Sequence, residues 1–451
     1  MKKPVKQLLL VLALLFGIHL AGAQTLIPLY SFTGGNDGNN PIAGLVQASD
    51  GNLYGTAPDG GTNGYGTVFR ITTSGTLTPL YSFTGGYDGA DPRGVLIQAS
   101  DGNLYGTTED GGTNDDGVVF RITTNGVLTP LYSFTGGHDG SDPRGGLVQA
   151  NDGNLYGTTS DGGTNFNGTV FRITTNGIFK TLYSFTGGHD GTFPESTLVQ
   201  AGDGKLYGTA YQGGISNGIA GYGALFRITT NGILTPLYSF TNGTDGADPV
   251  AGLTQASDGN LYGTTEIGGT NSYGAIFRIT TNGIFTRLYS FTDGHDGAYP
   301  LATLVQAYDG NLYGTAYEGG TNGYGTIFRI TTGGTFTSPY SFADGHDGAN
   351  PFAGLAQAGN GNLYGTALGG GTNAEGTVFE FTLPVAAPLL SILLNGHQSV
   401  LFWPSSANNY VLQSTTNLVS PNWVVITNTA PITSITVTNS SPAQYFRLAN
   451  P

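Results

Sequence analysis

The chain has 451 residues, of which 10% are charged and none is a cysteine. This length suffices for about two or three domains, and the lack of cysteine excludes disulfides, thiolate nucleophiles and cysteine metal sites. Acidic residues outnumber basic ones by 29 to 15, which leaves a formal net charge of −14. Such a charge should repel nucleic acid and anionic lipid, so we expect no nucleic-acid partner.

The first 23 residues have the pattern of a secretion signal. Three lysines lie within the first six residues, residues 8–18 form an apolar run, and Ala21-Gly22-Ala23 is a small-residue cleavage site. The run is shorter than the roughly 20 residues that a membrane-spanning helix needs, and no second such run follows. We therefore predict export through the general secretory pathway to the extracellular space or outer cell surface, with no transmembrane segment in the mature chain.

A tandem repeat follows the predicted signal. The motif Leu-Tyr-Gly-Thr occurs seven times, and successive motifs are 51 residues apart except for one step of 55. The tyrosines of the motif are Tyr54, Tyr105, Tyr156, Tyr207, Tyr262, Tyr313 and Tyr364. A repeat at such a period indicates one supersecondary unit that is copied and stacked.

Each copy contains four apolar strand patterns, which in the copy at residues 94–137 cover 95–99, 103–108, 118–123 and 127–134. Asp-Gly and Asn-Gly dipeptides between these strands are strong hairpin signals, because both turn residues need positive φ. Four-stranded units of this length are typical of propeller blades, and seven is a usual number of blades. We therefore predict an all-β fold with a seven-bladed β-propeller of four-stranded blades and 51-residue repeats.

The ends of the array predict how the ring closes. The fourth-strand motif Tyr-Ser-Phe also occurs seven times, but its first copy precedes any blade and the seventh blade lacks its own. Pairing of residues 25–33 with the strand around Phe379 would satisfy both exposed edges. We assign residues 24–382 to the propeller and residues 383–388 to a proline-containing linker. The alternating pattern of residues 389–451 predicts a small C-terminal β-sandwich.

The repeat reads Gly-Leu-Val-Gln-Ala-x-Asp-Gly-Asn-Leu-Tyr-Gly-Thr, then Gly-Gly-Thr-Asn, then Gly-Thr-Val-Phe-Arg-Ile. This pattern resembles the bacterial GloVer (choice-of-anchor) tandem-repeat family over roughly residues 25–382. The resemblance implies an exported, surface-associated protein without an established activity. Residues 389–451 look like a fibronectin-like or sorting-associated module of exported bacterial proteins.

An Asp-Gly dipeptide recurs in each loop that leads into a blade. Its aspartates are Asp37, Asp88, Asp139, Asp190, Asp245, Asp296 and Asp347. We interpret them as Asx turns that hold a long loop, and calcium or sugar binding is the alternative. The alternative is better supported where a second acid follows three residues later, at Asp88 with Asp91, Asp139 with Asp142, and Asp245 with Asp248. The first two pairs are candidate calcium ligands, although we predict no cofactor.

Three other residue types recur at fixed positions. Histidine precedes the loop aspartate in four copies, and we interpret His138, His189, His295 and His346 as surface residues too far apart to share zinc. One strand position carries arginine in six copies and Glu380 in the seventh, and we expect pairing with a loop or turn aspartate, with an anion-binding ring as the alternative. A glutamine on the first strand of every blade should form hydrogen bonds between blades.

The fourth copy departs most from the others. Glu195 stands where other copies have small, arginine or apolar residues, and a four-residue insertion lies between Tyr211 and Tyr222. The loop before each first strand and the loop between the second and third strands should lie on one face, so Glu195 and the insertion could form one asymmetric patch. A glycosidase needs two carboxylates about 5 to 9.5 Å apart, and Glu195 is the one candidate. We therefore predict that the protein is not an enzyme.

The predicted function is that of an exported, monomeric, non-catalytic scaffold that binds a glycan or a surface protein through its loops. The candidate binding residues are Asp88, Asp91, Asp139, Asp142, Asp245, Asp248, Tyr211 and Tyr222. A glycan-active enzyme centred on the fourth copy and a purely structural surface spacer are the alternatives.

Overall fold

The computed structural model describes residues 24–216 and 219–384, together with six strands between residues 391 and 449. The chain divides into a compact unit of Ala23–Leu383 and a second unit that contains Pro384–Pro451. The predicted signal peptide, residues 1–23, lies outside the described residues. All regular elements that the structure describes are β-strands, and no helix able to cross a membrane occurs among them.

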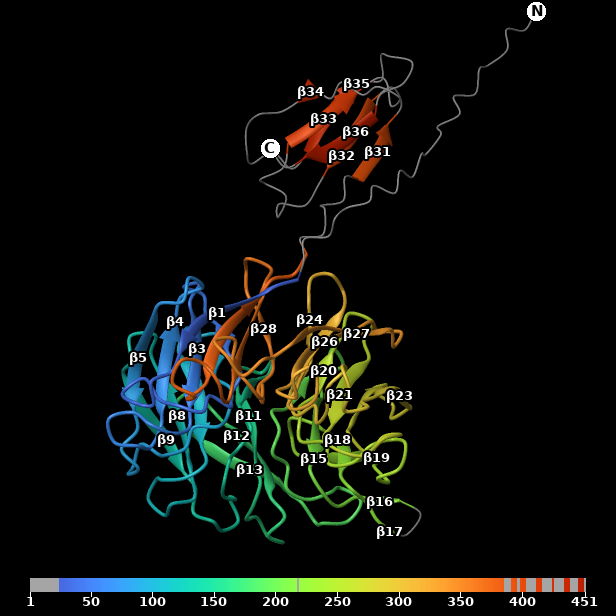
Figure 1. Cartoon of the computed structure of the whole chain (residues 1–451). Helices are drawn as coiled ribbons and strands as arrows, with labels where there is room; N and C mark the ends of the chain where they lie inside the picture. Colours follow the sequence, from blue (N-terminus) through green and yellow to red (C-terminus); the bar gives the residue numbers. More distant parts are fainter. Residues whose placement is uncertain are drawn as a thin grey trace, which may run out of the picture. The chain divides into compact units, whose positions relative to one another are not determined.

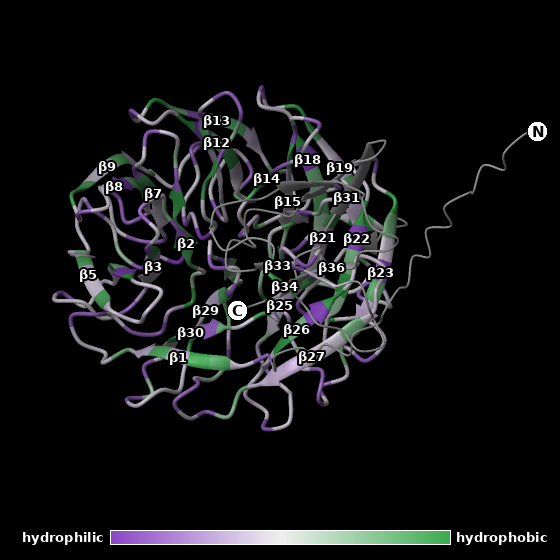
Figure 2. Ribbon diagram, turned by 90° about the horizontal axis from the view of Figure 1, so that it is seen from above, coloured by the Kyte–Doolittle hydropathy of each residue, from purple (hydrophilic) through white to green (hydrophobic). Residues whose placement is uncertain are grey.

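Four-stranded antiparallel sheets form the blades of the first unit, and seven of them are arranged in a ring (Figure 2). The first strands are β2 (Val46–Gln47), β6 (Ile97–Gln98), β10 (Val148–Gln149), β14 (Val199–Gln200), β20 (Thr254–Gln255), β24 (Val305–Gln306) and β28 (Ala356–Gln357). The second strands are β3 (Leu53–Ala57), β7 (Leu104–Thr108), β11 (Leu155–Thr159), β15 (Leu206–Ala210), β21 (Leu261–Thr265), β25 (Leu312–Ala316) and β29 (Leu363–Ala367). We number the blades 1 to 7 in this order.

The remaining strands complete each blade from the inside outwards. The third strands are β4 (Thr67–Ile71), β8 (Val118–Ile122), β12 (Thr169–Ile173), β18 (Ala224–Ile228), β22 (Ala275–Ile279), β26 (Thr326–Ile330) and β30 (Thr377–Phe381). The fourth strands are β5 (Leu77–Ser82), β9 (Leu128–Ser133), β13 (Phe179–Ser184), β19 (Leu234–Ser239), β23 (Phe285–Ser290), β27 (Phe336–Ser341) and β1 (Leu26–Ser31). This arrangement confirms the predicted seven-bladed propeller.

Closure of the ring by the N-terminal strand is also confirmed. β1 pairs antiparallel with β30, with Leu26 opposite Phe381 and Ser31 opposite Thr377. The Phe32 backbone N–H then donates to the Gly376 carbonyl at 3.0 Å. In Figure 1, β1 at the blue end of the colour scale lies beside the orange strands of blade 7.

The first strands are shorter than predicted. β6 covers only Ile97–Gln98 of the expected residues 95–99. The residues that lead into the first strands bond to neighbouring blades instead of extending the ladder, as when the Gly146 N–H donates to Thr197 Oγ1 at 2.9 Å. We call these lead-in segments, residues 42–45 of blade 1 and their equivalents, the inner ring.

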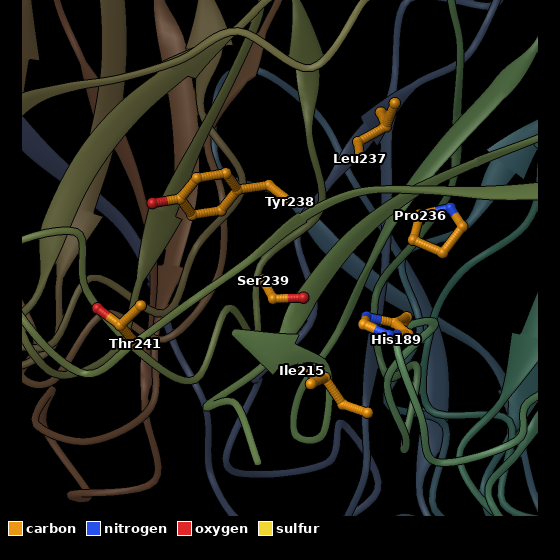
Figure 3. A pocket seen from close by; sticks show the side chains of 7 residues that line it. All are labelled: His189, Ile215, Pro236, Leu237, Tyr238, Ser239 and Thr241. Carbon is orange, nitrogen blue, oxygen red and sulfur yellow. The ribbon is translucent and has the colours of Figure 1, made fainter. Parts of the chain in front are cut away.

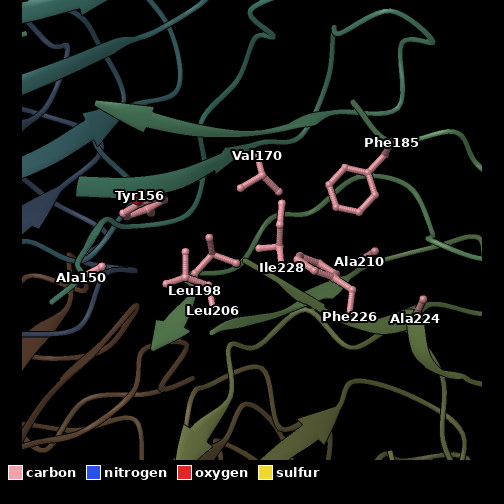
Figure 4. Packing of buried hydrophobic residues seen from close by; sticks show 10 residues of the cluster. All are labelled: Ala150, Tyr156, Val170, Phe185, Leu198, Leu206, Ala210, Ala224, Phe226 and Ile228. Carbon is pink, nitrogen blue, oxygen red and sulfur yellow. The ribbon is translucent and has the colours of Figure 1, made fainter. Parts of the chain in front are cut away.

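The hydrophobic core lies between neighbouring blades, which is why the strands are apolar on both faces. Figure 4 shows one cluster in which Tyr156, Val170 and Phe185 of blade 3 pack against residues of blade 4 that include Leu206 and Phe226. The tyrosine of every Leu-Tyr-Gly-Thr motif is 0% exposed. The glycine after it is needed for close packing, because a Cβ atom on Gly106 would lie 2.7 Å from Phe120 Cζ.

A closed circle of inter-blade hydrogen bonds joins the innermost strands of neighbouring blades. The Ser49 N–H donates to Gln98 Oε1 at 2.7 Å, and the same bond recurs between each pair of neighbouring blades. Its last member joins the Gly359 N–H of blade 7 to Gln47 Oε1 of blade 1 at 2.7 Å. The predicted inter-blade role of the glutamines is therefore confirmed.

The second unit is also built from strands. β31 (Ser391–Asn395), β32 (Gln398–Phe402) and β35 (Ser434–Thr438) form one antiparallel sheet, and β34 (Val424–Val425), β33 (Val411–Thr415) and β36 (Tyr445–Ala449) form another. Two small antiparallel sheets are what a β-sandwich requires.

Candidate functional site

The two loop sets of each blade lie on one face, as predicted. The loop that enters a blade forms a β-bridge with the loop between its second and third strands, as at Asn39 with Asp59 and Ala90 with Asp110. Equivalent bridges occur in the other five blades. We call the surface made by these loops, residues 33–45 and 57–67 of blade 1 and their equivalents, the loop face.

The repeated Asp-Gly aspartates are structural hydrogen-bond acceptors. The carboxylate of Asp88 accepts from the Tyr81 hydroxyl at 2.9 Å, from the Thr84 N–H at 2.9 Å and from the Thr84 hydroxyl. The tyrosine bond recurs at Asp37, Asp139, Asp190, Asp245, Asp296 and Asp347. Burial, followed by the hydrogen bond to Asp88, raises the pKa of Tyr81 to about 12. The predicted role in holding the loop is confirmed, but each aspartate accepts from the residue four earlier and not from the residue two later, so the turn is not the predicted Asx turn. The carboxylates of Asp88, Asp139 and Asp245 are already engaged.

The second acids have different surroundings from the first. Asp91, Asp142 and Asp248 have left-handed backbones, with φ between 54° and 55°. Asp91 binds Arg93, with 2.8 Å between Oδ2 and Nη2. Burial raises the pKa of Asp142 to about 6, assisted by Asp161 and Glu109, and burial raises the pKa of Asp248 to about 6. No group of three or more His, Asp or Glu side chains with metal-site geometry occurs among the described residues.

A chain of alternating charges crosses blades 2, 3 and 4 at the loop-face end of the inner ring. Glu195 Oε1 lies 2.6 Å from Arg144 Nη1, and Arg144 Nε lies 2.8 Å from Glu109 Oε1. The other oxygen of Glu109 contacts Arg93 Nε. The Glu109 side chain is 10% exposed, so its charge interacts with both guanidinium groups in a medium less polar than water.

Acidic groups continue this chain into blade 5. Burial raises the pKa of Glu195 although Arg144 opposes the shift. The pKa of Glu266 is raised by burial and by the charges of Asp248 and Glu195. The pKa of Tyr211 is raised by burial and by the charges of Asp248, Glu266 and Glu195. These groups therefore share one electrostatic environment. We call them the inner cluster, which consists of Arg93, Glu109, Asp142, Arg144, Glu195, Tyr211, Asp248 and Glu266.

The other side of the inner ring is apolar and aromatic. The positions equivalent to Arg144 are occupied by Val250, Leu301, Phe352 and Ile42 in blades 5, 6, 7 and 1. Phe352 packs edge-to-face on Tyr317, with 6.2 Å between ring centroids. Tyr299 packs on Tyr273 in the same way at 6.0 Å. The inner ring thus carries charged side chains in blades 2, 3 and 4 and apolar ones in blades 5, 6, 7 and 1. Aromatic residues of nearby loops border the apolar side, which we call the aromatic half.

The repeat sequence itself decides the family. The family model described as Gloeobacter/Verrucomicrobia repeat matches residues 12–220 and 215–395. The chain belongs to this family. For the Gloeobacter/Verrucomicrobia repeat, the structure shows that one copy corresponds to one blade, apart from the fourth strand of blade 7, which the N-terminus supplies. No curated relative matches the sequence.

Comparison with solved structures shows the propeller fold alone. A puromycin hydrolase is 13% identical with a TM-score of 0.51, covering 83% of this chain and 60% of its own. The periplasmic gluconolactonase of Pseudomonas aeruginosa is 15% identical with a TM-score of 0.47, covering 90% of this chain and 99% of its own. A Dyadobacter fermentans protein of unknown function is 13% identical with a TM-score of 0.41, covering 79% and 98%.

The sequence interpretation found Glu195 but missed its partners. Arg93, Arg144 and Glu195 occupy equivalent positions in consecutive copies, 51 residues apart. Glu109 and Glu266 occupy a second set of equivalent positions, which carries Tyr211 in blade 4. Comparing charges at equal positions of the Gloeobacter/Verrucomicrobia repeat is the signal that would have found them.

The insertion of blade 4 has different neighbours from Glu195. It forms a hairpin of β16 (Ile215–Ser216) and β17 (Ile219–Ala220). Ile215 lines a shallow pocket of about 380 Å³ together with His189 and residues of β19 (Figure 3), whereas Glu195 bonds to Arg144. Tyr211 is the member of this loop whose electrostatic environment includes Glu195. Tyr222 is 44% exposed, and its N–H donates to the Phe240 carbonyl.

The remaining repeated positions have structural surroundings. All four repeated histidines are exposed, as predicted. Burial alone would raise the pKa of Asp101, but hydrogen bonds from Tyr105 and Asn103 and the charge of Arg121 outweigh it and lower the pKa. Arg121 therefore acts on the turn aspartate through its charge without forming the expected ion pair, and its Nη2 donates to Thr129 Oγ1 at 3.4 Å. Blade 7 changes both groups, because the neutral Asn360 replaces the aspartate and the acidic Glu380 replaces the arginine.

Proposed function

We propose that the protein is an exported carbohydrate-binding propeller whose ligand contacts the inner ring on the loop face. The observation that carries the proposal is that the charged inner cluster lies on the same loop face as the aromatic half, which includes Phe352 and is bordered by Tyr299. Export rests on the signal pattern of the first 23 residues.

Sugars need both halves of such a surface. Their hydroxyl groups donate to carboxylates and accept from guanidinium groups, which are the strongest hydrogen-bonding groups of a protein. Their C–H faces pack on apolar and aromatic side chains. Binding sites in general combine an apolar lining with a few oriented polar groups, and the inner cluster and the aromatic half supply these two components.

The surrounding scaffold favours binding without rearrangement. The tyrosine–aspartate bonds hold the loops that enter the blades, and the lead-in segments bond to neighbouring blades. Side chains that are already ordered lose less conformational entropy when a ligand binds. A site on this ring should therefore be preorganised.

A glycan array followed by calorimetry tests the proposal. We expect Glu195→Gln and Phe352→Ala each to weaken binding of a glycan identified on the array at least tenfold, because they remove one component from each half. Glu375→Gln is the matched control, since Glu375 lies on the loop face of blade 7 outside the inner cluster and bonds Asn39. Failure of all glycans to bind, or equal affinity of the three variants, would refute the proposal.

A glycan-active hydrolase is the second candidate, favoured by the raised pKa values in the inner cluster. Burial raises the pKa of Glu195, and that of Asp248 to about 6, and a raised carboxyl pKa is a requirement of a general acid. Hydrolysis of a polysaccharide panel, with loss of activity in Glu195→Gln, would support this function. An inactive wild-type protein would remove it.

A further inference from the structure

A second surface on blade 4 carries an inference that is independent of the inner cluster. The shallow pocket of about 380 Å³ lies against the fourth strand, β19, and the inserted hairpin. Figure 3 shows the side chains of His189, Ile215, Pro236 and Ser239 around one space. The ring of Tyr238 points away from them and stacks on Phe285 of blade 5, with 4.1 Å between ring centroids.

The repeat shows what occupies the equivalent space in the next blade. Counting along the copies, His189, Ile215, Pro236 and Ser239 of blade 4 correspond to Thr244, Thr270, Arg287 and Ser290 of blade 5. Arg287 Nη1 donates to the Thr244 carbonyl at 3.2 Å, to Thr270 Oγ1 at 2.6 Å and to Ser290 Oγ at 3.2 Å. In blade 5, an arginine side chain of the protein itself bonds to the residues that correspond to the pocket lining.

Blade 4 keeps two of the three acceptors around that arginine and has Pro236 at the arginine position, as blades 1, 2 and 7 have Pro79, Pro130 and Pro28. Pro236 is too short to reach across the space and has no donor. The Ser239 hydroxyl and the His189 carbonyl, which correspond to two of the three acceptors, form no hydrogen bond with any described residue. Ile215 replaces the third acceptor and makes one wall of the pocket apolar.

The same carbonyl position accepts a hydrogen bond in another blade. In blade 3, Thr181 Oγ1 donates to the His138 carbonyl at 3.3 Å, and Thr181 corresponds to Pro236. In blades 2, 3, 5, 6 and 7, the serine hydroxyl at the Ser239 position accepts from a threonine N–H. The backbone N–H of Ile215 makes no such bond to Ser239 in blade 4, so this serine differs from these five, and Ser82 Oγ of blade 1 likewise has no partner among the described residues.

We propose that the pocket of blade 4 binds a guanidinium group presented by a partner, such as the arginine side chain of a peptide. The guanidinium would donate to Ser239 Oγ and to the His189 carbonyl, as Arg287 does within blade 5. Ile215, Pro236 and Leu237 would contact the apolar stem of the side chain, which keeps its charged end at the polar wall. The negative charge of the chain favours the approach of such a cation.

Binding of N-acetyl-arginine methylamide to the full chain, measured by saturation-transfer NMR and calorimetry, tests this proposal. Pro236→Arg places the protein's own guanidinium in the pocket and should reduce affinity at least tenfold. Pro130→Arg is the matched control, because Pro130 occupies the equivalent position of blade 2 and its substitution should leave affinity unchanged. Ser239→Ala, which removes one acceptor without adding bulk, should weaken binding several-fold and covers the case in which Pro236→Arg fails to fold.

Three results would overturn the proposal. The first is no binding of N-acetyl-arginine methylamide to the wild-type chain, and the second is equal affinity of wild type and Ser239→Ala for it. The third is equal binding of N-acetyl-lysine methylamide and the arginine probe, which would indicate attraction by net charge alone. The variants leave the inner cluster intact, so the two proposals are tested separately. Glycan binding can fail while the blade 4 pocket binds its probe, and the pocket can fail to bind while the glycan binds.

Discussion

Phe32 provides a test of how strongly the N-terminal strand holds the ring. Its side chain is 0% exposed and packs edge-to-face on Phe69 of blade 1, with 5.3 Å between ring centroids. Replacing such a phenylalanine by alanine removes its buried apolar surface and leaves a cavity, which together cost about 3–5 kcal/mol. Against a typical domain stability of about 5–15 kcal/mol, this loss is a third or more. We therefore expect Phe32→Ala to lower the melting temperature and the urea midpoint markedly.

Phe83 is the matched control for this experiment. It occupies the equivalent position at the end of β5, is 0% exposed, and packs on Phe120 at the same 5.3 Å. Its strand, however, follows the rest of its blade directly along the chain, whereas β1 reaches blade 7 only through pairing with β30. If Phe32→Ala costs less than about 1 kcal/mol while Phe83→Ala costs its full 3–5 kcal/mol, the closure strand does not contribute to global stability and our reasoning is refuted. Deletion of residues 24–33 should abolish folding for the same reason.

Three further outcomes are expected. Burial raises the pKa of Asp248 to about 6, so its contribution to stability is complete below the unfolded pKa of about 3.9 and is lost as the pH rises through 6. Asp248→Asn should therefore raise the melting temperature at pH 7.5 but not at pH 3.5. Equal increases at both pH values would contradict this reasoning. Asn360→Asp places a carboxylate at the Tyr364 hydroxyl that already contacts Glu380 Oε1 at 3.0 Å, and should cost about 1–2 kcal/mol in urea unfolding. Adding Glu380→Arg should restore stability, and the absence of coupling between the two changes would refute the link between these positions. Gln98→Ala removes the acceptor of the Ser49 N–H and should cost about 1 kcal/mol, whereas an unchanged urea midpoint would show that the glutamine bonds contribute nothing.

The fold was predictable because the same local signals recur in every copy. One hairpin signal is ambiguous, but the same turn at the same place in seven copies leaves little alternative to a four-stranded blade. The shorter first strands were not predictable, since β6 begins only at Ile97, after Gly94, which lies against Gly145 and Gly146 of blade 3. Apolar residues there satisfy a strand pattern although their backbone does not extend the ladder.

The candidate site was predictable only in part. Glu195 and the insertion stand out because they break the repeat, and departures from a repeat are visible in sequence alone. The partners of Glu195 are Arg144, 51 residues away, and through it Glu109, 86 residues from Glu195. Such contacts depend on which loops the ring brings together, and the expected patch of Glu195 with the hairpin missed that Ile215 contacts the outer strand instead.

The sequence by itself determined the number of blades, the strand that closes the ring and the blade that differs from the rest. It could do so because turn residues and apolar alternation act over a few residues, and repetition makes them unambiguous. The tertiary structure decided which charges meet, because residues at equal positions of different copies become neighbours only after the ring closes. It also decided that the seven loop aspartates bind tyrosines, and that the position filled by Arg287 in blade 5 corresponds to a pocket in blade 4.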